Sequence, residues 1–193
     1  MSEFSLYKRL SLELNRAVLS LRADEHRLHQ LFWECTLRCN LNCRHCGSDC
    51  RVVSQQDDMP LADFVKVLDD IKAHVSPYDI MVITTGGEPL VRADIAECGR
   101  AITERGFIWG MVTNGMLLTD EKLAELVRNG LRSIAISLDG FSDDHNWMRG
   151  NEASFANAMR AIEALKKQNG LVWDVITCVN KRTIKYLPEF RDF

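Results

Sequence analysis

Three cysteines stand close together in the stretch Cys39-Asn-Leu-Asn-Cys43-Arg-His-Cys46. Their spacing, C-x3-C-x2-C, follows a strand-like run over residues 31–36. Three thiolates from one short loop can bind three corners of an iron–sulfur cubane, whereas a structural zinc site or a ferredoxin-type cluster normally takes four protein ligands. The triad therefore predicts a metal centre that leaves one corner open for chemistry.

The turn Gly86-Gly87-Glu88-Pro89 follows the next predicted strand. Its two glycines let a ligand approach the backbone N–H and C=O groups, because no side chain stands in the way. Glu88 adds a negative charge, and Pro89 fixes the direction in which the chain leaves the turn. Such a turn can bind an ammonium group. Taken alone, however, the same four residues more often form a tight connection between a strand and a helix.

Further polar residues follow the later predicted strands. Asn114 comes after the third strand, Asp139 after the fourth with Arg149 beyond it, and Asn180 after the fifth. In parallel α/β folds, ligands gather at the carboxyl ends of the strands. We therefore expect the cysteine triad, the glycine turn and these polar residues to share one edge of a sheet.

The elements that position these residues are predicted from apolar periodicity and from helix caps. Strands are expected over residues 31–36, 79–84, 108–113, 133–138 and 172–179. Helices are expected over 6–22, from 61 with Asp58 as its cap, over 92–105, 119–130 and 151–168, and a further helix begins near 187. We expect the amphipathic first helix to pack on the domain. A membrane-surface role is the alternative, but its polar face is not uniformly basic.

Strict alternation of strands and helices predicts an α/β fold with a parallel sheet, because parallel strands need crossover connections. The predicted strands lack polar alternation, as expected for strands buried on both faces. Five strands with four helices between them are expected. Periodicity alone leaves open whether the sheet is flat or curls into part of a barrel.

Composition narrows the class of protein. A chain of 193 residues with a net charge of -3 has room for one domain, and it lacks the basic stripe of a nucleic-acid binder. No apolar run approaches the ~18 residues needed to span a bilayer, and residues 1–5 lack the basic region followed by an apolar region that is typical of a signal peptide. The seven cysteines are an odd number, which argues for reduced thiols that hold metal. We expect a soluble, cytoplasmic protein that binds neither nucleic acid nor membrane.

The cysteine triad and the Gly-Gly-Glu-Pro turn, in this order after the first two strands, resemble the signature motifs of the radical S-adenosylmethionine superfamily. The resemblance implies a [4Fe-4S] cluster on Cys39, Cys43 and Cys46, with S-adenosylmethionine bound at the fourth iron. It implies a partial TIM-type (βα)6 barrel over residues 30–193, preceded by a helical extension over 1–29. The last βα unit of that barrel is missing, so we expect a fragment or a truncated chain.

The resemblance also implies roles for the polar residues. Gly86, Gly87 and Glu88, with Pro89 closing the turn, would face the ammonium group of the cofactor's methionine. Ser137 and Asp139 would face the ribose hydroxyls, with Asn114 nearby. Arg149 would pair with the methionine carboxylate, and its alternative is a solvated loop arginine. His45, where the family usually has an aromatic residue, would present its ring to the adenine.

The sequence around the triad is most similar to the branch of the superfamily that modifies peptides and proteins. The implied partners are a peptide or protein substrate and an electron donor such as flavodoxin or ferredoxin. The implied reaction is reductive cleavage of S-adenosylmethionine to a 5′-deoxyadenosyl radical that abstracts hydrogen. Two alternatives stay open: a cluster-binding protein without turnover, and a structural zinc module that uses four of the cysteines between positions 35 and 50. A porphyrin precursor is also open as the substrate.

Overall fold

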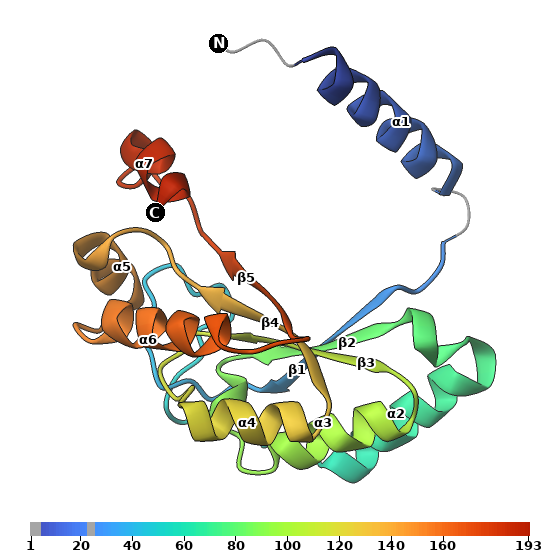
Figure 1. The fold of residues 1–193 in the computed structure, drawn as a ribbon. Helices are drawn as coiled ribbons and strands as arrows, with labels where there is room; N and C mark the ends of the chain where they lie inside the picture. Colours follow the sequence, from blue (N-terminus) through green and yellow to red (C-terminus); the bar gives the residue numbers. More distant parts are fainter. Residues whose placement is uncertain (1–4, 23–25) are drawn as a thin grey trace.

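One parallel sheet of five strands, in the order β1-β2-β3-β4-β5, organises the protein. A computed structural model describes residues 5–22 and 26–193 (Figure 1). The strands are β1 (Gln30–Thr36), β2 (Met81–Gly86), β3 (Ile108–Thr113), β4 (Leu131–Ser137) and β5 (Val172–Ile176). The predicted α/β class and parallel sheet are confirmed, and every strand lies next to its neighbour in sequence.

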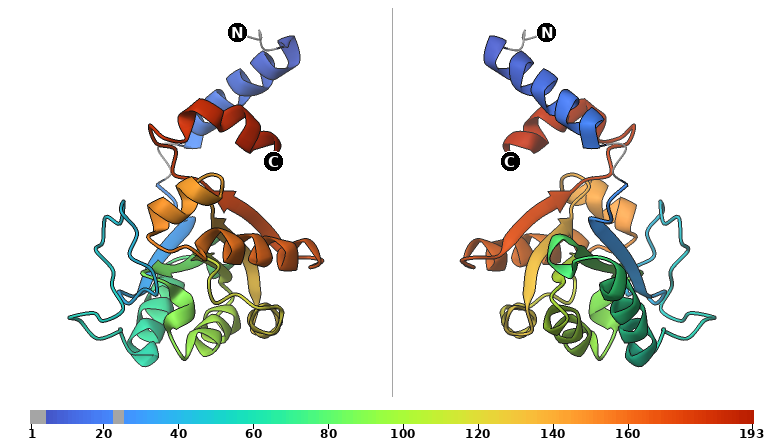
Figure 2. Two further views of the ribbon diagram at one scale, coloured as in Figure 1. Left: turned by 90° about the vertical axis from the view of Figure 1, so that its left-hand side faces the viewer. Right: turned by 90° about the vertical axis from the view of Figure 1, so that its right-hand side faces the viewer.

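Helices follow the strands in turn along one face of the sheet. They are α2 (Leu61–His74), α3 (Ile95–Glu104), α4 (Asp120–Arg128) and α6 (Ser154–Lys166). Each of these helices contacts the next, from α2 to α3, from α3 to α4 and from α4 to α6. Figures 1 and 2 show α2, α3 and α4 side by side below a sheet that curves toward α6. This curved sheet with helices outside is part of a TIM-type barrel.

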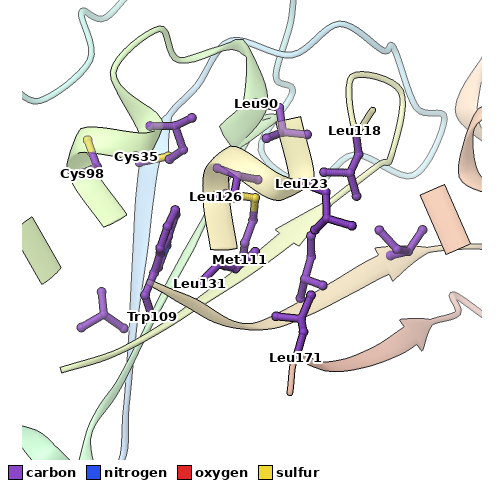
Figure 3. Packing of buried hydrophobic residues seen from close by; sticks show 14 of the residues in the cluster. Cys35, Leu90, Cys98, Trp109, Met111, Leu118, Leu123, Leu126, Leu131 and Leu171 are labelled. Atoms are coloured by element: carbon purple, nitrogen blue, oxygen red, sulfur yellow. The ribbon is translucent and has the colours of Figure 1, made fainter. Parts of the chain in front are cut away.

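The main core lies between the sheet and this row of helices (Figure 3). Trp109 and Met111 point from β3 toward the helices: Met111 lies near Leu126 of α4, and the Trp109 ring lies against Gly99 of α3. Cys98 of α3 is fully buried in the same core, as the sequence predicts. Burial of apolar side chains on this face is what fixes the sheet and its helices as one unit.

Caps explain where several helices begin and end. The Thr119 side chain accepts a hydrogen bond from the backbone N–H of Lys122, which confirms it as the cap of α4. The predicted cap of α2 is wrong: Pro60 occupies the cap position, and Asp58 instead accepts a hydrogen bond from Arg38 at 2.5 Å. Both groups in this hydrogen bond are charged, which makes it one of the stronger kind.

Two helices, instead of the predicted one, connect β4 to β5. The additional helix is α5 (Ser142–Arg149), and it ends at Gly150 with a left-handed φ of 66°. Its sequence is mainly polar, so apolar periodicity gave no signal. His145 and Met148 are its buried residues. This helix carries Arg149, which the sequence left open as a residue of a solvated loop.

The N-terminal helix α1 (Leu6–Arg22) extends away from the sheet (Figure 1). Leu6, Leu10, Leu14 and Leu21 are more than half exposed, so the predicted packing of this helix is not seen among the described residues. Residues 1–4 and 23–25 of the predicted extension over 1–29 lie outside the described part of the chain. Within residues 5–22 and 26–193, no helix combines the length and the apolar character that a bilayer span requires.

The chain ends with two short helical segments, η3 (Ile184–Tyr186) and α7 (Leu187–Asp192), which follow β5. Phe141, at the start of α5, contacts Phe190 and Phe193 edge to face. These ring contacts attach the last segment to the loop after β4. The helix predicted near residue 187 is confirmed.

Gly99 of α3 provides a test of this packing. A Cβ atom there would lie 1.9 Å from the ring of the fully buried Trp109. Because the ring has no free space to move into, we expect Gly99→Ala to lower the free energy of unfolding by about 2 kcal/mol. Urea unfolding followed by tryptophan fluorescence measures this change. Gly47→Ala is the control, since a Cβ there meets no described atom within 4 Å; equal stability of the two variants would contradict the packing.

Candidate functional site

The three cysteines of the triad line one cavity of ≈ 260 Å³ at the carboxyl edge of the sheet. Cys39 is buried, Cys43 is partly buried and Cys46 is exposed. The loop that carries them leaves β1, and the ends of β2, β3 and β4 form the rest of the wall. The structure therefore brings together nine of the predicted site residues: Cys39, Cys43, Cys46, Gly86, Gly87, Glu88, Asn114, Ser137 and Arg149.

Pro89 and Asp139, the other two predicted site residues, lie behind the cavity wall. Pro89 is buried at the start of the short helix η2 (Pro89–Val91). Asp139 is also buried, and its carboxylate points to protein partners. Their positions suggest support of the site rather than direct contact with a ligand.

The glycine turn binds the base of the cysteine loop. The N–H of Gly87 donates to the Thr36 carbonyl at 2.7 Å, and the N–H of Glu88 donates to the Arg38 carbonyl at 2.9 Å. A Cβ on Gly86 would lie 2.3 Å from the Thr36 oxygen, and one on Gly87 would lie 2.1 Å from the Arg38 oxygen. The two glycines are thus required for the close approach of the protein's own backbone, and they also line the cavity in which the sequence predicts a ligand.

Glu88 is fully buried and joins the ends of β2 and β3. Its carboxylate accepts hydrogen bonds from the Leu90 N–H at 3.1 Å, the Thr113 hydroxyl at 2.7 Å and the Asn114 N–H at 2.8 Å. Burial raises the pKa of Glu88, and these three donors oppose that shift. The carboxylate therefore fixes the chain at Asn114 as well as contributing to the cavity wall.

Cys39 lies beside donors that suit a thiolate. The Leu41 N–H donates to its sulfur at 3.5 Å, and the Asn114 amide lies 4.0 Å from the same sulfur. That amide also donates to the Asn40 side chain at 2.8 Å, which fixes its orientation. N–H groups directed at a ligating sulfur stabilise its negative charge.

The other two cysteines have similar donors. Arg149 Nη1 donates to the Cys43 sulfur at 3.8 Å, and the Cys50 N–H donates to the Cys46 sulfur at 3.4 Å. Burial raises the pKa of Cys43, while the guanidinium of Arg149 opposes that shift. A metal ion would supply the positive charge that a buried thiolate needs. The donor set therefore fits a thiolate-bound cluster.

The remaining cysteines bear on the zinc alternative. Cys35 is buried in the main core, whereas Cys50 lines the cavity with the triad. In the described part of the chain, no three His, Cys, Asp or Glu side chains converge on a position for a single metal ion. The three cysteines of a cubane each bind a different iron and do not need to converge. Cys178, which the sequence predicted to be core, is exposed beyond β5.

Arg149 is held by an ion pair and is not the solvated loop arginine of the alternative interpretation. Its Nε donates to Asp139 Oδ2 at 2.7 Å, with Arg149 only 12% and Asp139 only 1% exposed. The second carboxylate oxygen, Oδ1, accepts from the Cys178 N–H at 3.0 Å. Both oxygens of Asp139 thus have partners in the protein.

Two residues of the site escaped sequence reasoning. Buried Arg92 donates to the carbonyls of Cys35 at 2.7 Å and Met59 at 2.9 Å, and so ties the end of β1 to the segment before α2. His145 is fully buried and accepts a hydrogen bond from the Asp139 N–H at 3.0 Å. Because His145 stands four residues before Arg149, both lie on one face of α5. The spacing would have pointed to His145 if a helix had been predicted over these residues.

The pH dependence of stability tests the burial of His145. Burial, reinforced by Arg149, lowers the pKa of His145 from 6.5 to about 4. In the unfolded chain His145 binds a proton near its ordinary pKa of 6.5, whereas in the folded protein it stays neutral down to about pH 4. Its contribution to stability is therefore complete above pH 6.5 and is lost as the pH falls toward about 4.

Between about pH 7.5 and about pH 5, we expect this group to lower the free energy of unfolding by about 2 kcal/mol. Urea unfolding at both values measures the change. His145→Phe cannot titrate, so its loss of stability over the same interval should be smaller by that amount. Equal losses in the two proteins would contradict the neutral buried histidine.

Curated relatives share the sequence over most of this chain. An Fe-coproporphyrin III synthase of Methanosarcina barkeri is 27% identical, over 96% of this chain and 45% of its own length. An AdoMet-dependent heme synthase of Oleidesulfovibrio alaskensis is 32% identical, over 83% of this chain and 40% of its own length. The chain thus spans less than half of the length of these relatives.

Solved structures share the fold. The anSMEcpe structure with bound AdoMet has a TM-score of 0.71 at 21% identity, over 86% of this chain and 48% of that chain. SuiB of Streptococcus suis bound to S-adenosylmethionine has a TM-score of 0.69 at 18% identity, over 100% of this chain and 44% of that chain. At such identities the likeness concerns the fold alone.

A family model described as the radical SAM superfamily matches residues 33–193, which include the whole sheet from Trp33 onward and every residue of the cavity. Members of this superfamily are enzymes that use a [4Fe-4S] cluster and S-adenosylmethionine. The match, the parallel sheet and the cysteine loop at its carboxyl edge agree, and this chain belongs to the radical SAM superfamily.

Proposed function

We propose that the protein binds a [4Fe-4S] cluster through Cys39, Cys43 and Cys46 and cleaves S-adenosylmethionine reductively. The observation that carries this proposal is the single cavity at the sheet edge, which the triad shares with the glycine turn and with the ends of β3 and β4. The hydrogen-bond donors beside each sulfur support it further. A reduced cluster supplies the electron that converts S-adenosylmethionine to methionine and a 5′-deoxyadenosyl radical.

The cavity residues divide into three proposed roles. Ser137 and Asn114 line it and would face the ribose, and Arg149 would face the carboxylate of the methionine. The turn at Gly86 and Gly87, with Glu88, would face the ammonium group. These groups would orient the cofactor and exclude water from the reacting centre.

Two residues act in this proposal by holding others. Asp139, expected at the ribose, would instead fix Arg149, since both of its carboxylate oxygens have protein partners. Pro89 would direct the chain from the turn into the short helix η2. An electron donor such as flavodoxin or ferredoxin would reduce the cluster.

For the substrate we propose a peptide or protein from which the radical abstracts hydrogen, as the sequence around the triad suggests. A second candidate is a porphyrin-type substrate. It is favoured by the names of two relatives, the Fe-coproporphyrin III synthase and the AdoMet-dependent heme synthase. Incubation with each class, followed by mass spectrometry of the product, distinguishes them.

Anaerobic reconstitution with iron and sulfide tests the proposed reaction. After reduction with dithionite, we expect an electron paramagnetic resonance signal of a [4Fe-4S] cluster that changes when S-adenosylmethionine is added. Chromatography should then detect 5′-deoxyadenosine. A changed signal without 5′-deoxyadenosine would favour a cluster-binding protein without turnover, and bound zinc without a cluster would favour the structural zinc module.

Substitution of single cysteines tests the ligand set. We expect Cys43→Ala to lose the cluster, because two thiolates in one loop hold a cubane poorly. Iron and sulfide analysis with the absorption spectrum after reconstitution measures the loss. Cys98→Ala is the matched control, since Cys98 lies in the main core away from the cavity. Retention of a full cluster by Cys43→Ala, or its loss from a folded Cys98→Ala, would contradict the assignment.

A further inference from the structure

A chain of buried hydrogen bonds runs from α6 to the cysteine loop. Ser154 of α6 contacts His145 Nε2 at 2.9 Å, and His145 Nδ1 accepts from the Asp139 N–H at 3.0 Å. The Asp139 carboxylate accepts from Arg149 Nε at 2.7 Å, and Arg149 Nη1 reaches the Cys43 sulfur at 3.8 Å. Three of these residues, Ser154, His145 and Asp139, are at most 1% exposed.

These hydrogen bonds determine the tautomer of the His145 ring. A backbone N–H can only donate, so Nδ1 must carry a lone pair and no proton. The ring proton is then on Nε2 and is donated to the Ser154 hydroxyl. A protonated ring would place an N–H against the Asp139 N–H in a buried site, which is unfavourable. Burial also lowers the pKa of His145 to about 4, so the neutral ring persists at neutral pH.

The orientation of Asp139 controls where the guanidinium of Arg149 lies. The Asp139 backbone is fixed by His145, and its carboxylate is fixed by the Cys178 N–H at 3.0 Å. Arg149 then donates one hydrogen bond from Nε to the Asp139 carboxylate and another from Nη1 to the Cys43 sulfur. A small rotation of Asp139 would move the second nitrogen away from Cys43.

We propose that His145 is a positioning residue: through Asp139 it directs the guanidinium of Arg149 onto the sulfur of Cys43. This inference rests on the proposed function in one respect, that Cys43 binds the cluster. A charged N–H donor stabilises negative charge on a ligating sulfur, and hydrogen bonds to sulfur raise the reduction potential of a cluster. His145 would thereby set the ease with which the cluster accepts its electron.

A matched pair of substitutions separates this role from general stability. In His145→Asn, the amide oxygen can take the place of Nδ1 and accept from the Asp139 N–H, while the contact to Ser154 is lost. In His145→Gln, the amide can take the place of Nε2 and contact Ser154, while the acceptor for Asp139 is lost. Each variant loses one buried hydrogen bond, so both should be destabilised to a similar degree.

The position of Arg149 can be measured without a cluster. In the metal-free protein of 193 residues, NMR follows exchange of the Arg149 Nε proton with solvent. We expect exchange about tenfold faster in His145→Gln, the factor that corresponds to one hydrogen bond, and unchanged exchange in His145→Asn. Equal exchange in the two variants, whether fast or slow, would overturn the proposal.

The reconstituted proteins provide a second readout. We expect the midpoint potential of the cluster to be more negative in His145→Gln and in Arg149→Met than in the wild type, and unchanged in His145→Asn. A lower potential in Arg149→Met alone would overturn the role of His145. Failure of the wild type to assemble any cluster would refute the proposed function and leave the proton-exchange result to decide the positioning role.

The wild-type ring gives a test that needs no variant. Nitrogen-15 NMR of the histidines at neutral pH should show His145 with a proton on Nε2 and none on Nδ1. The opposite tautomer would overturn the proposal, because Nδ1 could not then accept from Asp139.

Discussion

The site depends on the close approach of two backbones at the carboxyl ends of β1 and β2. The N–H groups of Gly87 and Glu88 donate to the carbonyls of Thr36 and Arg38, which begin the cysteine loop. A side chain at Gly86 would overlap the Thr36 oxygen, and one at Gly87 would overlap the Arg38 oxygen. Because the loop starts from this fixed base, its three sulfurs can face one cavity. Buried Arg92 ties the same end of β1 to the segment before α2 through the carbonyls of Cys35 and Met59.

Two buried carboxylates at the cavity, those of Glu88 and Asp139, have hydrogen-bond partners within the protein before any ligand binds. Glu88 accepts three hydrogen bonds, and both oxygens of Asp139 have partners. A buried carboxylate without such partners would be strongly unfavourable, so these hydrogen bonds hold both carboxylates in place, Glu88 in the cavity wall and Asp139 behind it. The sulfurs, by contrast, have few and long contacts, which leaves them available to a metal. The site thus combines carboxylates that are held by hydrogen bonds with cysteine sulfurs that can still bind a metal.

Much of the fold could be predicted because the strands are short apolar runs separated by capped amphipathic helices. Thr119, for example, marks the start of α4 by its own side chain. The additional helix α5 could not be predicted in this way, since its sequence is largely polar and His145 becomes buried through tertiary contacts with α6 and with Asp139. The packing expected of α1 was wrong for a related reason. An apolar stripe shows that a helix can pack against another element, but it does not show which element that is.

The sequence by itself determined the chemistry of the site. Three cysteines within one short loop, followed by the Gly-Gly-Glu-Pro turn, predict the three-ligand centre that we propose, because ligand type and spacing are local properties. The tertiary structure alone decided what each polar residue contacts. Asp139 holds Arg149 and accepts from Cys178, which is 39 residues away, and His145, on the same helix as Arg149, accepts from the backbone N–H of that aspartate. The contact with Cys178 arises because β4 and β5 are neighbours in the parallel sheet although helices separate them in sequence.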